Sequence, residues 1–254
     1  MTDRLNVLVA ILVTTLALPA AAWAKKCPKD SVAVGPVCVD TYEASVWTTT
    51  DAALVKKIQK GRIMDAADLA GATQQGVASD DYGAGCPDTG NGCVDSYAVS
   101  VPGVTPSADI TWFQATAACR NAGKRLATNQ EWQQAALGTP DGAPCIVSGV
   151  AAGQTGTAGC VSDVGAFDMV GNLSEWVADW VPASTTCPGW GGVSDDVMCL
   201  SGASTGTLGP GALLRGGNFF SISVGAIAGV FAVDGRVEPW SSSGGIGFRC
   251  ARQP

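Results

Sequence analysis

Apolar and polar residues follow a regular period only over short stretches of this chain. The segment "VCVDTYEASVW" (37–47) alternates in part and predicts a strand. Residues 51–76 are rich in alanine and polar side chains, which predicts one or two short helices with a break at Gly61. Residues 81–107 are rich in turn formers, and the stretch 97–101 within them favours a strand.

Two helices are indicated more clearly. In residues 108–126, Trp112, Ala115 and Cys119 recur at helical spacing, and Gly123 is typical of a helix end. In residues 128–138, Thr128 and Glu131 stand three positions apart, as in a capping box, and the segment ends at a glycine.

The second half of the chain has weaker periodicity. Residues 139–215 read as loops, interrupted by "FDMVGNLSEWVADW" (167–180). The last quarter favours short strands at "ALLRGG" (212–217), "AGVFAV" (228–233) and "IGFRCAR" (246–252). With 33 glycines and 13 prolines to interrupt long elements, the pattern predicts an α+β fold with little regular secondary structure.

The first 24 residues are set apart from this fold. A positive charge at Arg4 precedes the apolar run "VLVAILVTTLAL", and "AWA" (22–24) fits a cleavage site after Ala24. We expect residues 1–24 to be a signal peptide and 25–254 to be a single exported domain without a membrane span. A retained anchor is the alternative. The exported chain would be periplasmic, on the cell surface or extracellular.

Ten cysteines lie in the remaining 230 residues, and an oxidising compartment favours five disulfides. Spacing alone does not determine which cysteines pair. Neighbours in the sequence favour four short loops, and Cys119 and Cys250 are left over. These four are Cys27–Cys38, Cys86–Cys93, Cys145–Cys160 and Cys187–Cys199.

Composition excludes several kinds of site. The chain has no histidine, so a Ser-His-Asp or Cys-His catalytic site and any histidine-ligated metal are ruled out. If every cysteine pairs, no thiolate nucleophile is left. The formal net charge of −7 argues against nucleic acid as a partner, because binding phosphates requires a basic surface.

Five stretches together resemble the sulfatase-modifying factor family, whose fold is the C-type-lectin-like fold of the formylglycine-generating enzyme. They are "VDTYEAS" (39–45), "ITWFQATAACRNAGKRLATNQEWQQAA" (110–136), "GAFDMVGNLSEWVADW" (165–180), "LLRGGNFF" (213–220) and "IGFRCAR" (246–252). The resemblance implies a disulfide between Cys119 and Cys250. It also implies structural roles for Arg215 and Arg249.

The enzymes of this family oxidise a substrate cysteine with two copper-binding thiols. Counted from the R-G-G turn, those thiols would stand at Ser221 and Ala226, and neither residue has a sulfur atom. The sequence therefore predicts a non-catalytic relative, with the oxidase as a disfavoured alternative.

A second branch of the fold, the variable proteins of diversity-generating retroelements, is also similar. In those proteins the segment from R-G-G to G-F-R-C is rewritten at adenines, which makes 213–252 the expected variable segment. Randomised asparagine codons can encode every residue of 218–225 but neither Glu238 nor Trp240. The function expected is the binding of a protein or glycan ligand, and an invariant glycan-binding module is the alternative.

The expected contact surface mixes aromatic, aliphatic and small polar side chains, as antibody paratopes do. Phe231 and Phe248 are expected to be buried, whereas Phe219 could be core or surface. The expected ligand-binding residues are Asn218, Phe220, Ser221, Ser223, Val224, Arg236, Val237, Trp240, Ser242 and Ser243.

The family resemblance also implies a calcium site in "FDMVGNLSEW". Its ligands would be Asp168, Glu175 and the carbonyl oxygens of Gly171 and Leu173, a donor set that suits calcium. Ser174, however, stands where the family usually has tryptophan. The alternative is that Asp168 and Glu175 cap turns and pair with arginines.

Overall fold

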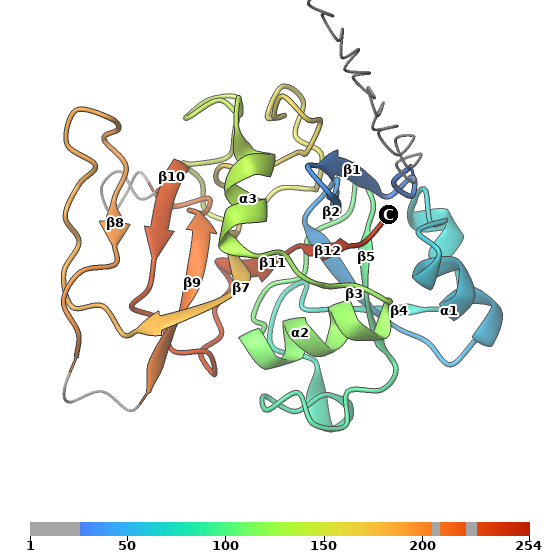
Figure 1. The fold of residues 1–254 in the computed structure, drawn as a ribbon. Coiled ribbons are helices and arrows are strands. Elements are labelled where there is room, and N and C mark those ends of the chain that lie inside the picture. Colours follow the sequence, from blue (N-terminus) through green and yellow to red (C-terminus); the bar gives the residue numbers. More distant parts are fainter. Residues whose placement is uncertain (1–25, 205–208, 222–227) are drawn as a thin grey trace, which may run out of the picture.

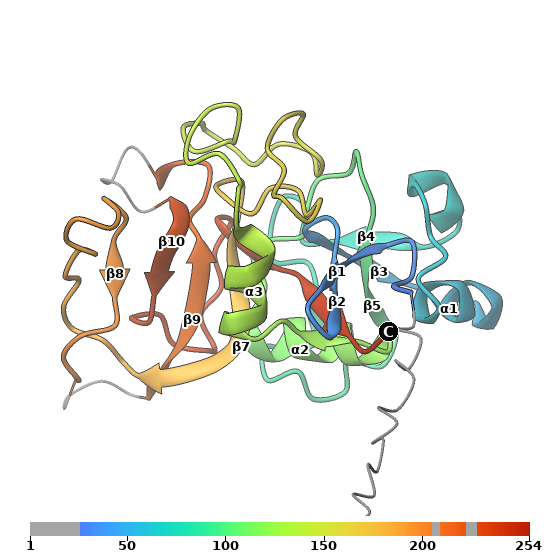
Figure 2. The same ribbon diagram turned by 45° about the horizontal axis from the view of Figure 1, so that its top comes forward.

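A computed structural model describes residues 26–204, 209–221 and 228–254, and Figures 1 and 2 show the arrangement of its elements. The helices are α1 (Ala52–Gln59), α2 (Trp112–Asn121) and α3 (Asn129–Ala136), with 3-10 turns η1 (Ala66–Leu69) and η2 (Gly83–Gly85). The strands of the first half are β1 (Ser31–Val34), β2 (Val37–Asp40), β3 (Ala44–Thr48), β4 (Thr73–Gln75), β5 (Ser96–Ser100) and β6 (Arg125–Leu126). Those of the second half are β7 (Ser174–Pro182), β8 (Met198–Cys199), β9 (Pro210–Gly216), β10 (Gly229–Asp234), β11 (Ile246–Phe248) and β12 (Cys250–Arg252).

The strands form three small sheets. One has the order β1-β2-β12-β6, the second β4-β3-β5, and the third β11-β7-β9-β10-β8. The third sheet is mixed: β9 pairs with β7 and with β10 in antiparallel, whereas β11 pairs with β7 and β8 pairs with β10 in parallel. The sheet strands β8, β9 and β10 lie at one end of the molecule and α1 lies at the other, with α2 and α3 between them (Figure 1).

Tryptophan side chains and a long disulfide build the core. Trp132 on α3 and Trp176 on β7 are fully buried, and Phe248 packs in the same core cluster as Trp176. The disulfide Cys119–Cys250 ties α2 to β12 across 131 positions of the sequence. Its two half-cystines are completely buried, so the link passes through the interior.

The structure contains five disulfides, and they are the five pairs expected from the sequence. Besides Cys119–Cys250 they are Cys27–Cys38, Cys86–Cys93, Cys145–Cys160 and Cys187–Cys199. No cysteine is free. Five disulfides are typical of proteins that fold in an oxidising compartment.

The expected fold class is confirmed: a mixed α and β structure with few helices and many loops. Helices α1 and η1 stand on either side of Gly61, and the capping box at Thr128 and Glu131 is formed. Phe248 is buried as expected. Phe231, expected to be buried, is only partly buried: its ring packs at 5.7 Å from Trp190, which is itself half-buried.

The expected signal peptide, residues 1–24, lies outside the described residues. Among the helices of residues 26–204, 209–221 and 228–254, none is both long and apolar enough to cross a bilayer.

Candidate ligand-binding site

A pocket with a cavity volume of about 210 Å³ opens beside the turn that follows β9. Three parts of the chain form its walls: the turn 217–221, the end of β10 with the residues after it, and the loop before β11. Most of its lining is apolar, and a few polar groups stand among the apolar side chains. The lining residues are Ser174, Leu214, Gly217, Asn218, Phe220, Ser221, Ala232, Val233, Asp234, Val237, Ser243 and Ile246.

Two glycines produce the turn that forms the first wall. Gly216 and Gly217 have φ angles of 80° and 74°, which lie in the left-handed region that favours glycine. A Cβ atom at Gly216 would lie only 2.7 Å from the carbonyl oxygen of Met169 and 3.1 Å from the Trp132 ring. The chain can therefore leave β9 this close to the core only with glycine at this position.

The next four residues form a turn that exposes Phe220. The Asn218 side chain accepts a hydrogen bond from the backbone N–H of Phe220 at 3.2 Å. The Ser221 hydroxyl accepts one from the N–H of Asn218 at 2.8 Å. Phe219 donates its backbone N–H to the carbonyl oxygen of Asn172 at 2.9 Å, which fixes the turn to the scaffold. The Phe220 side chain is 37% exposed and meets the Phe219 ring edge to face at 5.0 Å.

The loop before β11 lies directly against this turn. An added Cβ at Gly245 would lie 2.8 Å from the Asn218 side chain and 3.0 Å from the Phe220 ring. The loop is attached to the scaffold by the Ser174 N–H, which donates to the Gly245 carbonyl at 2.9 Å. Because the backbone of the loop at Gly245 lies against the side chains of Asn218 and Phe220, the turn and the loop form one continuous surface.

The third wall comes from β10 and the residues that follow. Asp234 lines the pocket, and Arg236 folds back onto it, with Nη2 at 2.7 Å from Oδ2. Hydrogen bonding to Asp234 raises the pKa of Arg236. The ion pair is solvent-exposed on the arginine side, so it gives the pocket rim a polar group without a net charge.

The structure brings five of the expected ligand-binding residues together around the pocket: Asn218, Phe220, Ser221, Val237 and Ser243. Arg236, Trp240 and Ser242 are exposed but do not line it. The indole of Trp240 instead lies against the backbone of Gly209. Ser223 and Val224 lie outside the described residues, as does Ala226.

Ser221 differs from the expectation of an exposed contact residue. Its side chain lines the pocket, but the residue is only 2% exposed. Its hydroxyl accepts a hydrogen bond from the Asn218 N–H, so the main role of Ser221 is to fix the backbone of the turn. The sequence does not identify Leu214, Val233 and Ile246 as the floor of the pocket. The pairing of the strands determines which strand residues face the pocket, and hydrophobic periodicity does not reveal that pairing.

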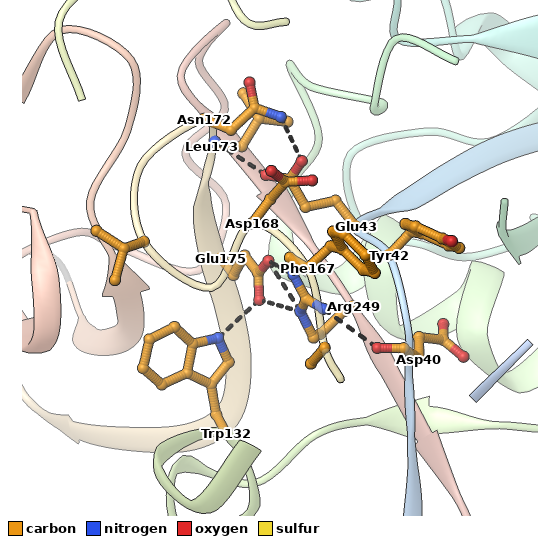
Figure 3. Close-up of polar contacts among 12 residues, drawn as sticks. Asp40, Tyr42, Glu43, Trp132, Phe167, Asp168, Asn172, Leu173, Glu175 and Arg249 are labelled. Carbon is orange, nitrogen blue, oxygen red and sulfur yellow. Dashed lines mark hydrogen bonds and ion pairs between the residues drawn. The ribbon is translucent and has the colours of Figure 1, made fainter. Parts of the chain in front are cut away.

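A buried ionic cluster surrounds Glu175, the neighbour of the pocket residue Ser174 on β7, and Figure 3 shows its contacts. Glu175 on β7 forms a two-pronged ion pair with Arg249, with contacts of 2.6 and 2.7 Å. The indole N–H of Trp132 donates to the same carboxylate at 2.7 Å. Arg249 also donates to the backbone carbonyl oxygens of Asp40 and Phe167. The side chains of Glu175, Arg249 and Trp132 are fully buried, and they join β7 to α3 and to the residue that follows β11.

Glu43 connects this cluster to the turn. Its fully buried carboxyl accepts a hydrogen bond from the Leu173 N–H at 2.9 Å and one from the side-chain amide of Asn172. Burial raises the pKa of Glu43 well above its ordinary value, and repulsion from Asp168 and Glu175 adds to the rise. Since Asn172 holds Phe219, a carboxyl in the core helps to set the position of the exposed turn.

The two carboxylates expected to bind calcium already have protein partners. Asp168 accepts hydrogen bonds from the backbone N–H groups of Gly156, at 2.6 Å, and Thr157, at 3.2 Å. Both oxygens of Glu175 contact Arg249. In the described ranges, no three histidine, cysteine or acidic side chains are grouped to hold a metal ion. Calcium binding by Asp168 and Glu175 with the carbonyls of Gly171 and Leu173 would require these two carboxylates to change partners, and it stays a prediction.

Comparisons with known proteins place this geometry in context. The family model described as "Sulfatase-modifying factor enzyme 1-like domain" matches residues 34–254. The formylglycine-generating enzyme of Thermomonospora curvata is 29% identical over 180 residues, which are 59% of this chain and 56% of that enzyme. The chain thus spans little more than half the length of this curated relative.

Solved structures with the same fold include variants of a protein named Major Tropism Determinant. The U1 variant superposes with a TM-score of 0.52 at 18% identity, over 89% of this chain and 53% of that one. The P3c variant gives a TM-score of 0.50 at 19% identity with the same coverage. At this level of identity the likeness shows a shared fold.

Proposed function

We propose that this chain, which belongs to the family of sulfatase-modifying factor enzyme 1-like domains, is a ligand-binding protein and not an enzyme. The observation that carries the proposal is the pocket between the turn 217–221 and the loop 243–246. An apolar floor, an exposed aromatic ring at Phe220 and small polar groups at Asn218 and Ser243 are the features of an adaptable binding surface.

The chemistry of the site argues against the family's oxidase reaction. That reaction depends on thiols, but Ser221 has a hydroxyl and every cysteine of the chain is in a disulfide. The test is incubation of the folded protein with copper, oxygen and a cysteine-containing peptide, followed by mass spectrometry. No formylglycine product is expected, and its formation would overturn the non-catalytic assignment.

The class of ligand can be tested with two small probes. Because the pocket floor is made of Leu214, Val233 and Ile246, we propose that it receives an apolar side chain of a protein ligand. N-acetyl-leucinamide should shift the methyl NMR signals of Val233 and Ile246, and methyl α-glucoside should leave them in place. A glucoside response without a leucinamide response would support the glycan-binding module instead.

We propose further that the segment 213–252 is diversified. The solved structures that share the fold are named as variants of a tropism determinant, which is consistent with a fold used for variable binding surfaces. The test is genomic: a near-copy of the DNA for 213–252, differing only at adenines, should stand beside the gene with a reverse transcriptase. Identical residues at 218–246 in all related strains would support an invariant module.

Export completes the proposal. Five disulfides support folding in an oxidising compartment, and residues 1–24 would direct the single domain 25–254 there. Amino-terminal sequencing of the protein recovered outside the cytoplasm should begin at Lys25. A chain that still carries residues 1–24 would support the retained anchor.

A further inference from the structure

Positive charge is gathered at one end of this acidic protein. Of the lysines and arginines that the structure describes, only Arg215, Arg236 and Arg249 lie elsewhere, and each of these donates to an acceptor of its own chain. The remaining lysines and arginines are on or next to α1, the end of α2, and β12. They are Lys26, Lys29, Lys56, Lys57, Lys60, Arg62, Arg120, Lys124, Arg125 and Arg252.

Five of these residues line an open groove with a cavity volume of about 710 Å³, which we call the basic groove: Lys60, Arg62, Lys124, Arg125 and Arg252. Hydrogen bonds between its three walls fix its shape. Arg252 donates to the carbonyl oxygen of Gln59 at 3.0 Å, and the Gln59 side chain donates to the carbonyl of Asn121 at 3.1 Å. These two hydrogen bonds join the end of α1 to the end of α2 and to β12.

The positive charges on the floor of the basic groove are paired with buried carboxylates. Lys124 contacts Asp30 at 3.0 Å and Asp40 at 2.6 Å, and Arg252 contacts Asp30 at 3.0 Å. All four side chains are buried or nearly so. These contacts hold the groove together, but they leave little charge on the floor for an external ligand.

The rim, in contrast, carries exposed charge. Lys60 and Arg62 are exposed, and within the described part of the chain neither takes part in a salt bridge. Arg125 is paired with Glu131. Lys56 on α1, Arg120 on α2, and Lys26 and Lys29 before β1 are exposed as well and add positive charge on the elements next to the groove in the sequence. The nearby carboxylates Asp65 and Asp68 accept hydrogen bonds from the backbone N–H groups of Ala67 and Met64, respectively, and form no salt bridge with the rim within the described residues.

This distribution fits a broad anionic surface better than a single small anion. Flexible lysines spread over an open rim attract diffuse negative charge, whereas recognition of one phosphate favours a preorganised arginine fork. Pro28, near the start of the described residues, also lines the groove. The candidate ligand-binding site is formed around β9 and β10, at the end of the molecule away from α1 (Figures 1 and 2).

We infer that the basic groove and its rim dock on a bilayer rich in anionic phospholipid and leave the candidate ligand-binding site facing away from the membrane. The attraction is electrostatic, so it weakens as salt is raised. Each unpaired lysine or arginine at such a surface strengthens binding by about fivefold. The inference is independent of the identity of the ligand bound at the other end.

The test is vesicle co-sedimentation of the full chain. Vesicles of phosphatidylcholine alone are compared with vesicles in which phosphatidylglycerol replaces a third of the lipid, so that any contribution of the apolar residues 1–24 is common to both. The full chain should bind the anionic vesicles more tightly. The variant Lys60→Gln/Arg62→Gln should lose about 25-fold of that binding, two charges at about fivefold each.

The matched control is Val150→Glu/Val164→Glu, which lowers the net charge by the same amount at exposed positions outside the groove. It should bind anionic vesicles within about twofold of the original chain. Thermal melts of both variants check that they are folded. Equal binding to the two kinds of vesicle, or an equal loss in both variants, would overturn the inference, and selective competition by an acidic peptide at constant ionic strength would assign the groove to a protein partner.

Discussion

Around the candidate site, single residues act mainly by fixing the course of the backbone. Gly216 permits a close approach to Trp132, Asn218 and Ser221 close the turn, and Glu43 holds the segment to which the turn is attached. The Phe220 side chain is exposed because of the course that these residues give the backbone, and it does not itself hold the backbone in place. Residue identity is therefore restricted at the turn's supports and free at its tip.

The restriction at Gly216 is open to a direct stability measurement. Gly216→Ala places a methyl group at a φ of 80° and 2.7 Å from a carbonyl oxygen, so it should lower the free energy of unfolding by about 3 kcal/mol. Gly71→Ala is the control, because Gly71 has a φ of 88° with nothing within 4 Å of the added atom. It should cost only about 1 kcal/mol. Equal losses in urea titrations would show that crowding at Gly216 is unimportant.

Glu43 gives the stability a pH dependence whose sign can be stated. Because its pKa is raised from an ordinary value of 4.5, the folded state binds the proton more tightly than the unfolded chain. The contribution of Glu43 to stability is therefore full below that value and is lost as the pH rises toward the raised pKa. Glu43→Gln stays neutral, so its stability relative to the original chain should increase between about pH 4 and neutral pH. Urea titrations at the two pH values measure this, and an unchanged difference would mean that Glu43 is ionised in the fold.

At the scale of elements, capped helices and tryptophans carry the scaffold on which the loops rest. Helix α3 begins with the capping box of Thr128 and Glu131 and buries Trp132 against the guanidinium of Arg215, at 4.6 Å from the ring centroid. Burial lowers the pKa of Arg215 to about 10. The start of α3 thus determines where the R-G-G turn leaves β9.

Removal of the cap should therefore be measurable. In Thr128→Ala the N–H of Glu131 loses its acceptor, and we expect a loss of about 1 kcal/mol in the free energy of unfolding. The control is Thr116→Ala in the interior of α2, where alanine is the better helix former and the change should stay within about 0.5 kcal/mol. A Thr128→Ala protein as stable as the control would mean that tertiary packing alone places α3.

Some of these features can be predicted from the sequence and others cannot, depending on whether neighbouring or distant residues determine them. Helices with local caps, such as those at Thr128 and Gly61, are encoded by neighbouring residues, and the glycine-rich turn at 216–217 is visible as a pattern. The pocket floor is not, because β7, β9 and β11 come together through pairings between distant segments. Glu43 was missed for the same reason: its partners lie about 130 positions away in the sequence.

At the scale of the whole molecule, disulfides replace regular secondary structure as the source of rigidity. The longest, Cys119–Cys250, closes a loop of 131 positions, whereas Cys27–Cys38 closes one of 11. In the chain-entropy model the longer loop restricts the unfolded chain more, because the entropy lost on closure grows with loop length.

This difference predicts an order of stabilities. Replacement of Cys119 and Cys250 by alanine should cost about 5 kcal/mol, and replacement of Cys27 and Cys38 about 3 kcal/mol. Guanidinium titrations of the two double variants under oxidising conditions provide the comparison. If removal of Cys27–Cys38 cost as much or more, the short loops and not the long one would determine the stability of the scaffold.

The central claim is that this scaffold carries a surface whose residues are free to vary. It is tested most directly by a saturation mutagenesis scan of 210–252, with the yield of folded, protease-resistant protein as the readout. The account predicts broad tolerance at Phe220, Ser242 and Ser243, and intolerance at Gly216, where the backbone approaches the core. If the exposed positions proved as sensitive as Gly216, the segment would be part of the fold, and the claim of a variable binding surface would be wrong.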